Sequence, residues 1–344
     1  MRIKDSNPEE RKSSVRGEGL RNYYLAFEGR TEYLYFKGIK ENRSLLKIPQ
    51  KIDLQLMDRY DQEAGQTKAS SIIEGMLEYK HALKTGEFKV KLFVNTIVQQ
   101  VYDFFKGDDM GHEERENFKS ALYSLQDNVV KNIIFDTSVC DGTIITSEEK
   151  AFRLCEDSII SKYPPIKGYL SQPNSLKLDT FDESMDVFCL IMDRDRSPSR
   201  DERYYSKIIE RCKDKINPIE LYITNSAFEF WLILHFDNSR KLSPEIKQKI
   251  LANKKITKKI KGKDITRNYA EWYLQDTLRA EYKMRYFNIY YSKTRIFFDE
   301  YYRDNIDAAI VNCNDCYTTN IDKLENSLGS NLGILINKIR KNQK

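Results

Sequence analysis

Acidic side chains follow two apolar stretches of the sequence that have the pattern of strands. Glu28 comes directly after residues 23–27, and Asp193 and Asp195 come after the unbroken apolar run 187–192. Alternate residues that continue a strand point the same way, so both aspartates can face one site. In an open parallel sheet the carboxyl ends of the strands share one edge, where ligands bind. We therefore expect three carboxylates to meet there.

Three carboxylates without a histidine are typical of a divalent-cation site. Like charges repel unless a cation neutralises them, and Mg²⁺ takes a few carboxylates together with water and phosphate oxygens. The pattern thus predicts Mg²⁺ (or Mn²⁺) as cofactor and phosphoryl transfer or phosphodiester hydrolysis as chemistry. A structural alternative stays open, because Asp195 and Ser197 can cap a following helix. Likewise, Glu32 can be a first-turn carboxylate favoured by the helix dipole.

The elements that must position these acids alternate between strand and helix. The apolar patterns predict strands at 23–27, 52–57, 187–192 and 219–223, and helices at 33–39, 67–84, 200–213 and 228–236. Gly29 permits a tight turn from the first strand into its helix. This order predicts one α/β domain with a parallel sheet. Further helices are expected at 90–105, 113–125 and 148–161.

Composition limits the class of protein. The chain has 344 residues, which suggests about two domains, and its 40% hydrophobic content excludes wholesale disorder. It has no apolar run of ~18 residues and no secretory leader pattern, so we expect no membrane span and a cytoplasmic location. Six cysteines are too few for a disulfide scaffold, and the single CxxC at Cys313 and Cys316 is a weak zinc signal. The three histidines do not cluster.

Charge is unevenly distributed along the chain. Residues 240–267 contain eleven lysines and arginines against two acids, whereas residues 99–183 contain nine against sixteen. A basic segment of this kind predicts contact with nucleic acid, although a lysine run can also be a solvated helix face. The candidate contacts are Arg30, Arg194, Lys254, Lys255, Lys258, Lys259 and Lys261. The acidic segment argues against direct contact with nucleic acid in that part of the chain.

Several motifs together resemble the RloB-like (AbiLii-like) family, which is related to Toprim domains. They are EGRTE at 28–32, DRD at 193–195, NSAFEFWLILHF at 225–236 and YSK at 291–293. The third is the most specific, although it departs from the family at 225–227, where members have an asparagine followed by proline. The resemblance covers about residues 20–57 and 186–325.

The resemblance implies a Toprim-like (Rossmannoid) α/β fold and a metal-dependent nuclease of anti-phage abortive infection, with DNA or RNA as substrate. It also implies a partner ATPase, since the chain has no Gly-rich phosphate loop of its own. By motif, Glu28, Asp193 and Asp195 would bind the metal and act in catalysis, with Glu229 and Glu32 as further acids. Lys293 would contact phosphate. The alternative for Glu229 is an ion pair with an arginine.

These patterns predict four parts of the chain. Residues 1–20 are a flexible basic tail, 21–59 with 185–236 a discontinuous Toprim-like catalytic domain, 60–184 a mainly helical acidic insertion, and 237–344 a helical basic and aromatic region. His235 is expected to be a satisfied core residue, and the aromatic residues around it core packing. A homo-oligomer is compatible with the sequence. The alternative function is a non-catalytic subunit that binds nucleic acid or a partner; a primase-type nucleotidyl transferase is less favoured.

Overall fold

The computed structural model describes residues 20–57, 69–85, 88–89, 144–145, 181–194, 203–260, 262–281 and 296–341. The chain forms two compact units. We call residues 1–18 with 75–184 the insertion unit, and residues 19–74 with 185–344 the sheet unit. The helices expected at 90–105, 113–125 and 148–161 lie outside the described residues.

A five-stranded sheet with the order β2-β1-β5-β6-β9 forms the centre of the sheet unit. Its strands are β1 (Arg21–Phe27), β2 (Ile52–Met57), β5 (Val187–Asp193), β6 (Glu220–Asn225) and β9 (Gly329–Ser330). The first four strands are parallel to their neighbours, and only β9 pairs antiparallel, with β6. β1 is buried along its whole length, as expected for a central parallel strand. The predicted α/β class with a parallel sheet is confirmed.

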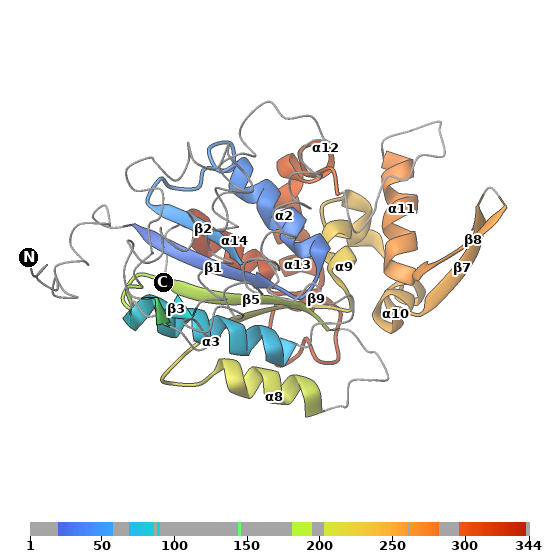
Figure 1. Cartoon of the computed structure of the whole chain (residues 1–344). Coiled ribbons are helices and arrows are strands. Elements are labelled where there is room, and N and C mark those ends of the chain that lie inside the picture. The colour runs from blue at the N-terminus through green and yellow to red at the C-terminus, as the bar shows by residue number, and fades with distance from the viewer. Residues whose placement is uncertain are drawn as a thin grey trace, which may run out of the picture. The chain divides into compact units, whose positions relative to one another are not determined.

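Two helices connect the parallel strands in opposite directions across the sheet. α2 (Arg30–Glu41) leads from β1 outward to β2, and α8 (Arg203–Cys212) leads from β5 to β6 on the other side. Because such crossovers are right-handed, the two helices cover opposite faces of the sheet (Figure 1). The direction of winding changes between β1 and β5. The carboxyl ends of these two strands therefore form the topological switch point, where open α/β sheets bind ligands.

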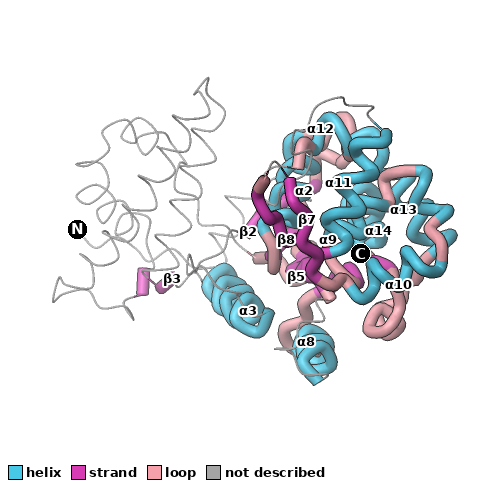
Figure 2. The backbone as a smooth tube through the Cα atoms, turned by 90° about the vertical axis from the view of Figure 1, so that its right-hand side faces the viewer, coloured by secondary structure: helices cyan, strands magenta, loops and turns pink. Residues whose placement is uncertain are grey.

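The C-terminal part of the sheet unit is mostly helical but contains a hairpin. Its elements are α9 (Phe228–Ile233), η2 (Asp237–Lys241), α10 (Pro244–Ala252), β7 (Lys255–Ile260), β8 (Lys263–Asn268), α11 (Tyr269–Glu281), α12 (Phe298–Tyr301), η3 (Arg303–Asn305), α13 (Ile306–Cys316) and α14 (Leu332–Lys341). The expectation of an almost wholly helical region is wrong at 255–268. β-branched isoleucines and threonines recur there, and Gly262 has φ +77°, which favours two strands joined by a tight turn. This hairpin extends beyond α10 and α11 (Figure 1), and Figure 2 looks onto it with β7 and β8 side by side.

The main core lies between the sheet and the C-terminal helices. Tyr35 of α2 lies at its centre, with edge-on ring contacts to Phe228 at 5.5 Å and Phe298 at 5.2 Å between centroids. Trp231 is completely buried in the same cluster. The aromatic residues of 228–236 and the described ones of 296–302 thus pack as core, as the sequence predicts.

The insertion unit is described only in short segments. The helix α3 (Ala69–Thr85), predicted at 67–84, begins in the sheet unit and continues into the insertion unit. There Phe181 donates its backbone N–H to the carbonyl of Leu83 at 3.5 Å, and Lys84 forms an ion pair with Glu183. β3 (Phe88–Lys89) pairs antiparallel with β4 (Ile144–Ile145). Across both units, every described helix is too short or too polar to span a bilayer.

Candidate functional site

Glu28 and Asp193 come together at the switch point. The ladder between β1 and β5 extends one residue past β1, since the N–H of Glu28 donates to the carbonyl of Ile191 at 3.0 Å. The Glu28 carboxylate turns across to β5, where its Oε2 accepts the N–H of Asp193 at 3.3 Å. Glu28 is 9% exposed and Asp193 half-buried. A hydrogen bond from the backbone of Asp193 to the carboxylate of Glu28 therefore joins two residues 165 positions apart in the sequence at the predicted edge of the sheet.

Tyr205 and Arg194 fix the end of β5. The hydroxyl of Tyr205, from α8, donates to the carbonyl of Asp193 at 2.9 Å. The N–H of Arg194 donates to the carbonyl of Thr224 at 2.8 Å, and its guanidinium lies 3.7 Å from the centroid of the Tyr205 ring. Its Nη2 is 3.9 Å from a carboxylate oxygen of Glu325. The guanidinium of Arg194 is thus held on an aromatic face at the end of β5, a contact that a guanidinium favours.

Glu32 occupies the turn between β1 and α2. It is 2% exposed, and a Cβ placed on Gly29 would come within 2.0 Å of its Oε2. The carboxylate therefore fills the space that a side chain at position 29 would need. Since Gly29 is the N-cap of α2, Glu32 also lies in the first turn, where the helix dipole favours an anion. The structural alternative for this residue thus has direct geometric support.

Glu229 lies in the first turn of α9, the helix that follows β6. It is 3% exposed within a helix whose residues are all buried. Asn225, the last residue of β6, donates its side-chain amide to the carbonyls of Leu324 and Ser327 at 2.7 and 3.0 Å. The loop containing Glu325 is thereby held at the end of β6, next to β5.

Other predicted residues lie elsewhere or outside the described part. Asp195, Lys293 and Lys261 are among the residues that the structure does not describe. Arg30 is exposed on α2, with its guanidinium 4.7 Å from the Tyr33 ring centroid. The predicted contacts Lys254, Lys255, Lys258 and Lys259 belong to the hairpin β7–β8 and the residue before it. Sequence reasoning missed Tyr205 and Glu325, because no local motif marks them and only packing brings them to the site.

Comparison with known families gives a result that fits this arrangement. The chain matches the family described as RloB-like protein over residues 23–339. The chain belongs to the RloB-like family. The match includes both acidic strand ends and the helix with Glu229, as well as the hairpin β7–β8. A search of curated proteins and a search of solved structures each returned no match.

The carboxylate oxygens at the switch point of this RloB-like chain are ligands of the type that a hard divalent cation prefers. Glu28 and Asp193 offer carboxylate oxygens at one sheet edge, and Mg²⁺ is commonly held by one or two carboxylates plus water. Among the described residues, no group of three or more histidine, cysteine, aspartate or glutamate side chains is arranged to hold a metal. The third predicted ligand, Asp195, follows the last described residue of this segment by one position.

Two titratable groups of the RloB-like core have structural roles. His235 is 2% exposed, with Nδ1 3.0 Å from the carbonyl of Trp231 and Nε2 2.9 Å from the Tyr35 hydroxyl. Burial lowers the pKa of this imidazole to about 3. Cys313 of the CxxC donates its thiol to the carbonyl of Ser330 at 3.2 Å, and burial raises its pKa to about 11. A neutral imidazole and a protonated thiol are typical of core packing. The expectation that His235 is a satisfied core residue is confirmed.

Proposed function

We propose that this RloB-like chain is a metal-dependent nuclease that hydrolyses phosphodiester bonds in DNA or RNA on a Toprim-like sheet. The single observation that supports it most is the hydrogen bond between the Glu28 carboxylate and the N–H of Asp193 at the switch point. An acid directly after one strand and an acid at the end of its neighbour lie where open α/β sheets bind ligands, and carboxylates there can hold the metal that assists phosphodiester hydrolysis.

The proposal gives each residue a role. Glu28 and Asp193 bind Mg²⁺ or Mn²⁺ together with Asp195, and the bound cation supplies charge neutralisation and an activated water. Arg194, held on the Tyr205 ring, binds a phosphate oxygen of the substrate. Tyr205 acts as a positioning residue through its hydrogen bond to Asp193. Glu229 is a further acid and Lys293 a phosphate contact, as the family motifs imply.

The biological setting is part of the same proposal. We place the activity in anti-phage abortive infection in the cytoplasm, with a partner ATPase. The described residues contain no Gly-rich phosphate loop before a helix that would make the chain an ATPase itself. A plating assay on cells with and without the chain and the ATPase encoded beside it tests this setting, since the proposal requires both proteins for protection against phage.

A cleavage assay with matched variants tests the activity. Plasmid DNA, single-stranded DNA and total bacterial tRNA are each incubated with Mg²⁺, Mn²⁺ or EDTA. Glu28→Gln and Asp193→Asn should each lower metal-dependent cleavage by at least about 100-fold, because each removes a ligand charge. Asp186→Asn is the matched control: Asp186 is also a buried carboxylate beside β5 that accepts a backbone N–H, from Asn22 at 2.9 Å, but at the opposite end of the strand.

The outcomes separate the two function classes. Cleavage that is lost in the two site variants and kept in Asp186→Asn supports the nuclease. Cleavage that survives in the double variant Glu28→Gln/Asp193→Asn refutes the assigned site. If the wild type, supplied with its partner ATPase, neither cleaves nor binds Mn²⁺ in calorimetry, the chain is instead a non-catalytic binding subunit.

A further inference from the structure

The hairpin β7–β8 is a ribbon with two different faces. Its register pairs Ile256 with Arg267 and Lys258 with Ile265, so these four side chains share one face, which we call the inner face. All four are partly buried. The other face, which we call the outer face, consists of Lys255, Thr257, Lys259, Asp264, Thr266 and Asn268. Its residues are exposed, except Asn268, which is partly buried.

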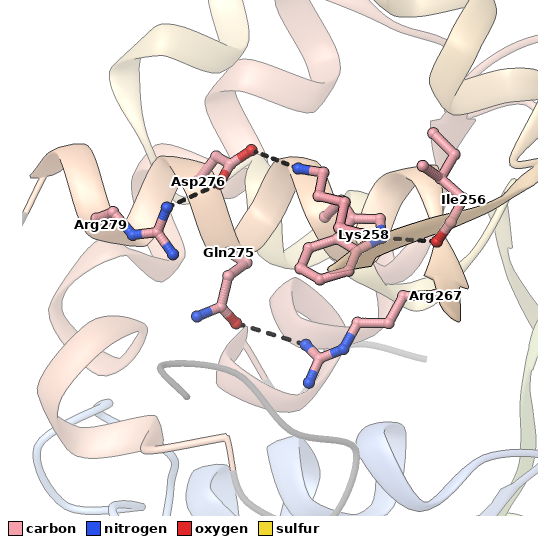
Figure 3. Close-up of polar contacts among 7 residues, drawn as sticks. Ile256, Lys258, Arg267, Gln275, Asp276 and Arg279 are labelled. Carbon is pink, nitrogen blue, oxygen red and sulfur yellow. Dashed lines mark hydrogen bonds and ion pairs between the residues drawn. The ribbon is translucent and has the colours of Figure 1, made fainter. Parts of the chain in front are cut away.

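The inner face is anchored to α11. Asp276 and Gln275 of this helix contact Lys258 and Arg267 (Figure 3), and its Trp272 packs against the same two cations. This indole is 4% exposed and donates its Nε1–H to the carbonyl of Ile256 at 2.9 Å. Lys258 and Arg267 lie 4.5 and 5.3 Å from the centroid of its ring. Lys258 also forms an ion pair with Asp276 at 3.2 Å. The inner cations thus stabilise the ribbon in one position, which reduces the entropy lost when the outer face binds a partner.

The outer face presents positive charge and hydroxyl groups. Lys255 and Lys259 project from it, and the hydroxyls of Thr257 and Thr266 lie 2.8 Å apart across the two strands. Lys254 at the base and Lys263 near the tip are exposed as well. Residues 254–268 hold seven lysines and arginines against one acid, Asp264, which pairs with Lys259 in the register. A surface of this composition is complementary to a phosphate backbone and reads no base sequence.

The absence of aromatic side chains from the outer face argues against a single-stranded ligand. Proteins that hold single strands stack the bases on exposed aromatic rings. The ring of Trp272, which packs on the inner face, is buried against Lys258 and Arg267 and is closed to stacking. The shape favours DNA over RNA, since the major groove of B-DNA admits a two-stranded ribbon and the groove of A-form RNA is too narrow.

We propose that the ribbon β7–β8 binds the backbone of double-helical DNA through its outer face and lies in or along the major groove. The inference rests on the proposed nuclease function for its purpose. The ribbon lies on the side of the sheet unit at which β1 and β5 finish (Figure 1). DNA held there lies on the side of Glu28 and Asp193. The substrate class of the nuclease is then duplex DNA.

Binding in EDTA tests this inference without any cleavage. The full chain is titrated into a labelled DNA duplex of about 20 base pairs, two helical turns, and its affinity is measured by fluorescence anisotropy over a series of salt concentrations. The ribbon variant carries Lys254→Gln, Lys255→Gln, Lys259→Gln and Lys263→Gln. The matched control replaces four exposed lysines elsewhere on the sheet unit by glutamine, at positions 51, 215, 241 and 341. Unchanged tryptophan fluorescence shows that Trp272 still anchors the ribbon.

The ribbon variant should bind at least about tenfold more weakly, and the slope of log K against log salt should fall by about three to four, since each phosphate contact contributes about 0.9. The control should keep the wild-type slope. Equal losses in both variants, or no loss in the ribbon variant, overturn the inference. So does equal or tighter binding of an RNA duplex or a single strand of the same length. If the two variants bind DNA as expected but the wild type cleaves no nucleic acid, the proposed nuclease function is refuted while the proposed DNA-binding role of the ribbon is retained.

Discussion

The surroundings of His235 make the free energy of unfolding of the sheet unit depend on pH. The carbonyl of Trp231 can only accept a hydrogen bond, so Nδ1 carries the proton and Nε2 accepts the Tyr35 hydroxyl. The buried ring is therefore neutral in the folded protein. Burial lowers its pKa from 6.5 to about 3. In the unfolded chain His235 takes up a proton near pH 6.5, whereas in the folded protein it stays neutral at that pH.

The sign and size of the effect follow by linkage. Because the unfolded state binds more protons between pH 3 and 6.5, the stability contributed by the neutral ring is complete above pH 6.5 and is lost as the pH falls. From these two pKa values, unfolding at pH 5.5 costs about 1 kcal/mol less than at pH 7.5, and at pH 4.5 about 3 kcal/mol less. The value at pH 5.5 stays the same for any folded pKa below about 4.5.

The variant His235→Gln removes the titration and keeps an acceptor for the hydroxyl of Tyr35. Urea unfolding is followed by tryptophan fluorescence at pH 7.5 and 5.5. The chain has two tryptophans, Trp231 and Trp272, and both belong to the sheet unit, so the signal reports that unit alone. The wild type should lose about 1 kcal/mol more than His235→Gln between the two pH values. Any other titrating groups cancel in this difference.

The variant His81→Gln serves as the control for removing an imidazole, because His81 is exposed on α3 in the insertion unit. It should leave the difference between the two pH values at its wild-type size. If His235→Gln loses as much free energy of unfolding between pH 7.5 and 5.5 as the wild type does, the imidazole is not held neutral in the core and the reasoning fails.

Three glycines give further predictions, the first two measured by the same unfolding experiment. Gly29→Ala should destabilise the sheet unit by about 1–2 kcal/mol, because its Cβ would meet the Glu32 carboxylate, and the cost should shrink in a Glu32→Ala background. An equal cost in both backgrounds contradicts the contact. Gly38→Ala should cost about 1–3 kcal/mol, since its Cβ would lie 2.2 Å from Cγ of Phe298. By contrast Gly75→Ala, at a helix position of the insertion unit with open space around it, should be neutral or stabilising in urea unfolding followed by circular dichroism, which also reports that unit; destabilisation there would contradict the steric argument.

The sheet and its two acids were accessible from the sequence for a simple reason. Strands buried on both faces need unbroken apolar runs, and such runs identify β1 and β5 and hence the residues at their ends. The proximity of Glu28 to Asp193 then follows once the two strands are parallel neighbours, since their carboxyl ends share one edge of the sheet. The sequence does not show that the Glu28 carboxylate accepts the N–H of Asp193, because this hydrogen bond depends on the register of β1 and β5, which lie far apart in the chain.

The hairpin β7–β8 shows where the same reasoning failed. Ile256 and Ile260 are four positions apart, which fits a helix face as well as alternate positions on one strand face. The run of lysines was compatible with either. The decision comes from Gly262 at the turn and from Trp272, whose indole packs on the inner face. A tertiary contact of that kind has no signature in local periodicity.

The insertion unit need not disturb the site that it interrupts. Glu28 and Asp193 are brought together by the pairing of β1 with β5, whose register runs from Tyr23 opposite Val187 to Phe27 opposite Ile191. The entropy of closing the intervening segment grows only slowly with its length, so a long insertion costs little once the strands are paired. A register slip of two residues would instead move Asp193 by about 7 Å and break its hydrogen bond to Glu28. The site therefore depends on the side chains that fix this register, with Leu25 opposite Cys189 at its centre.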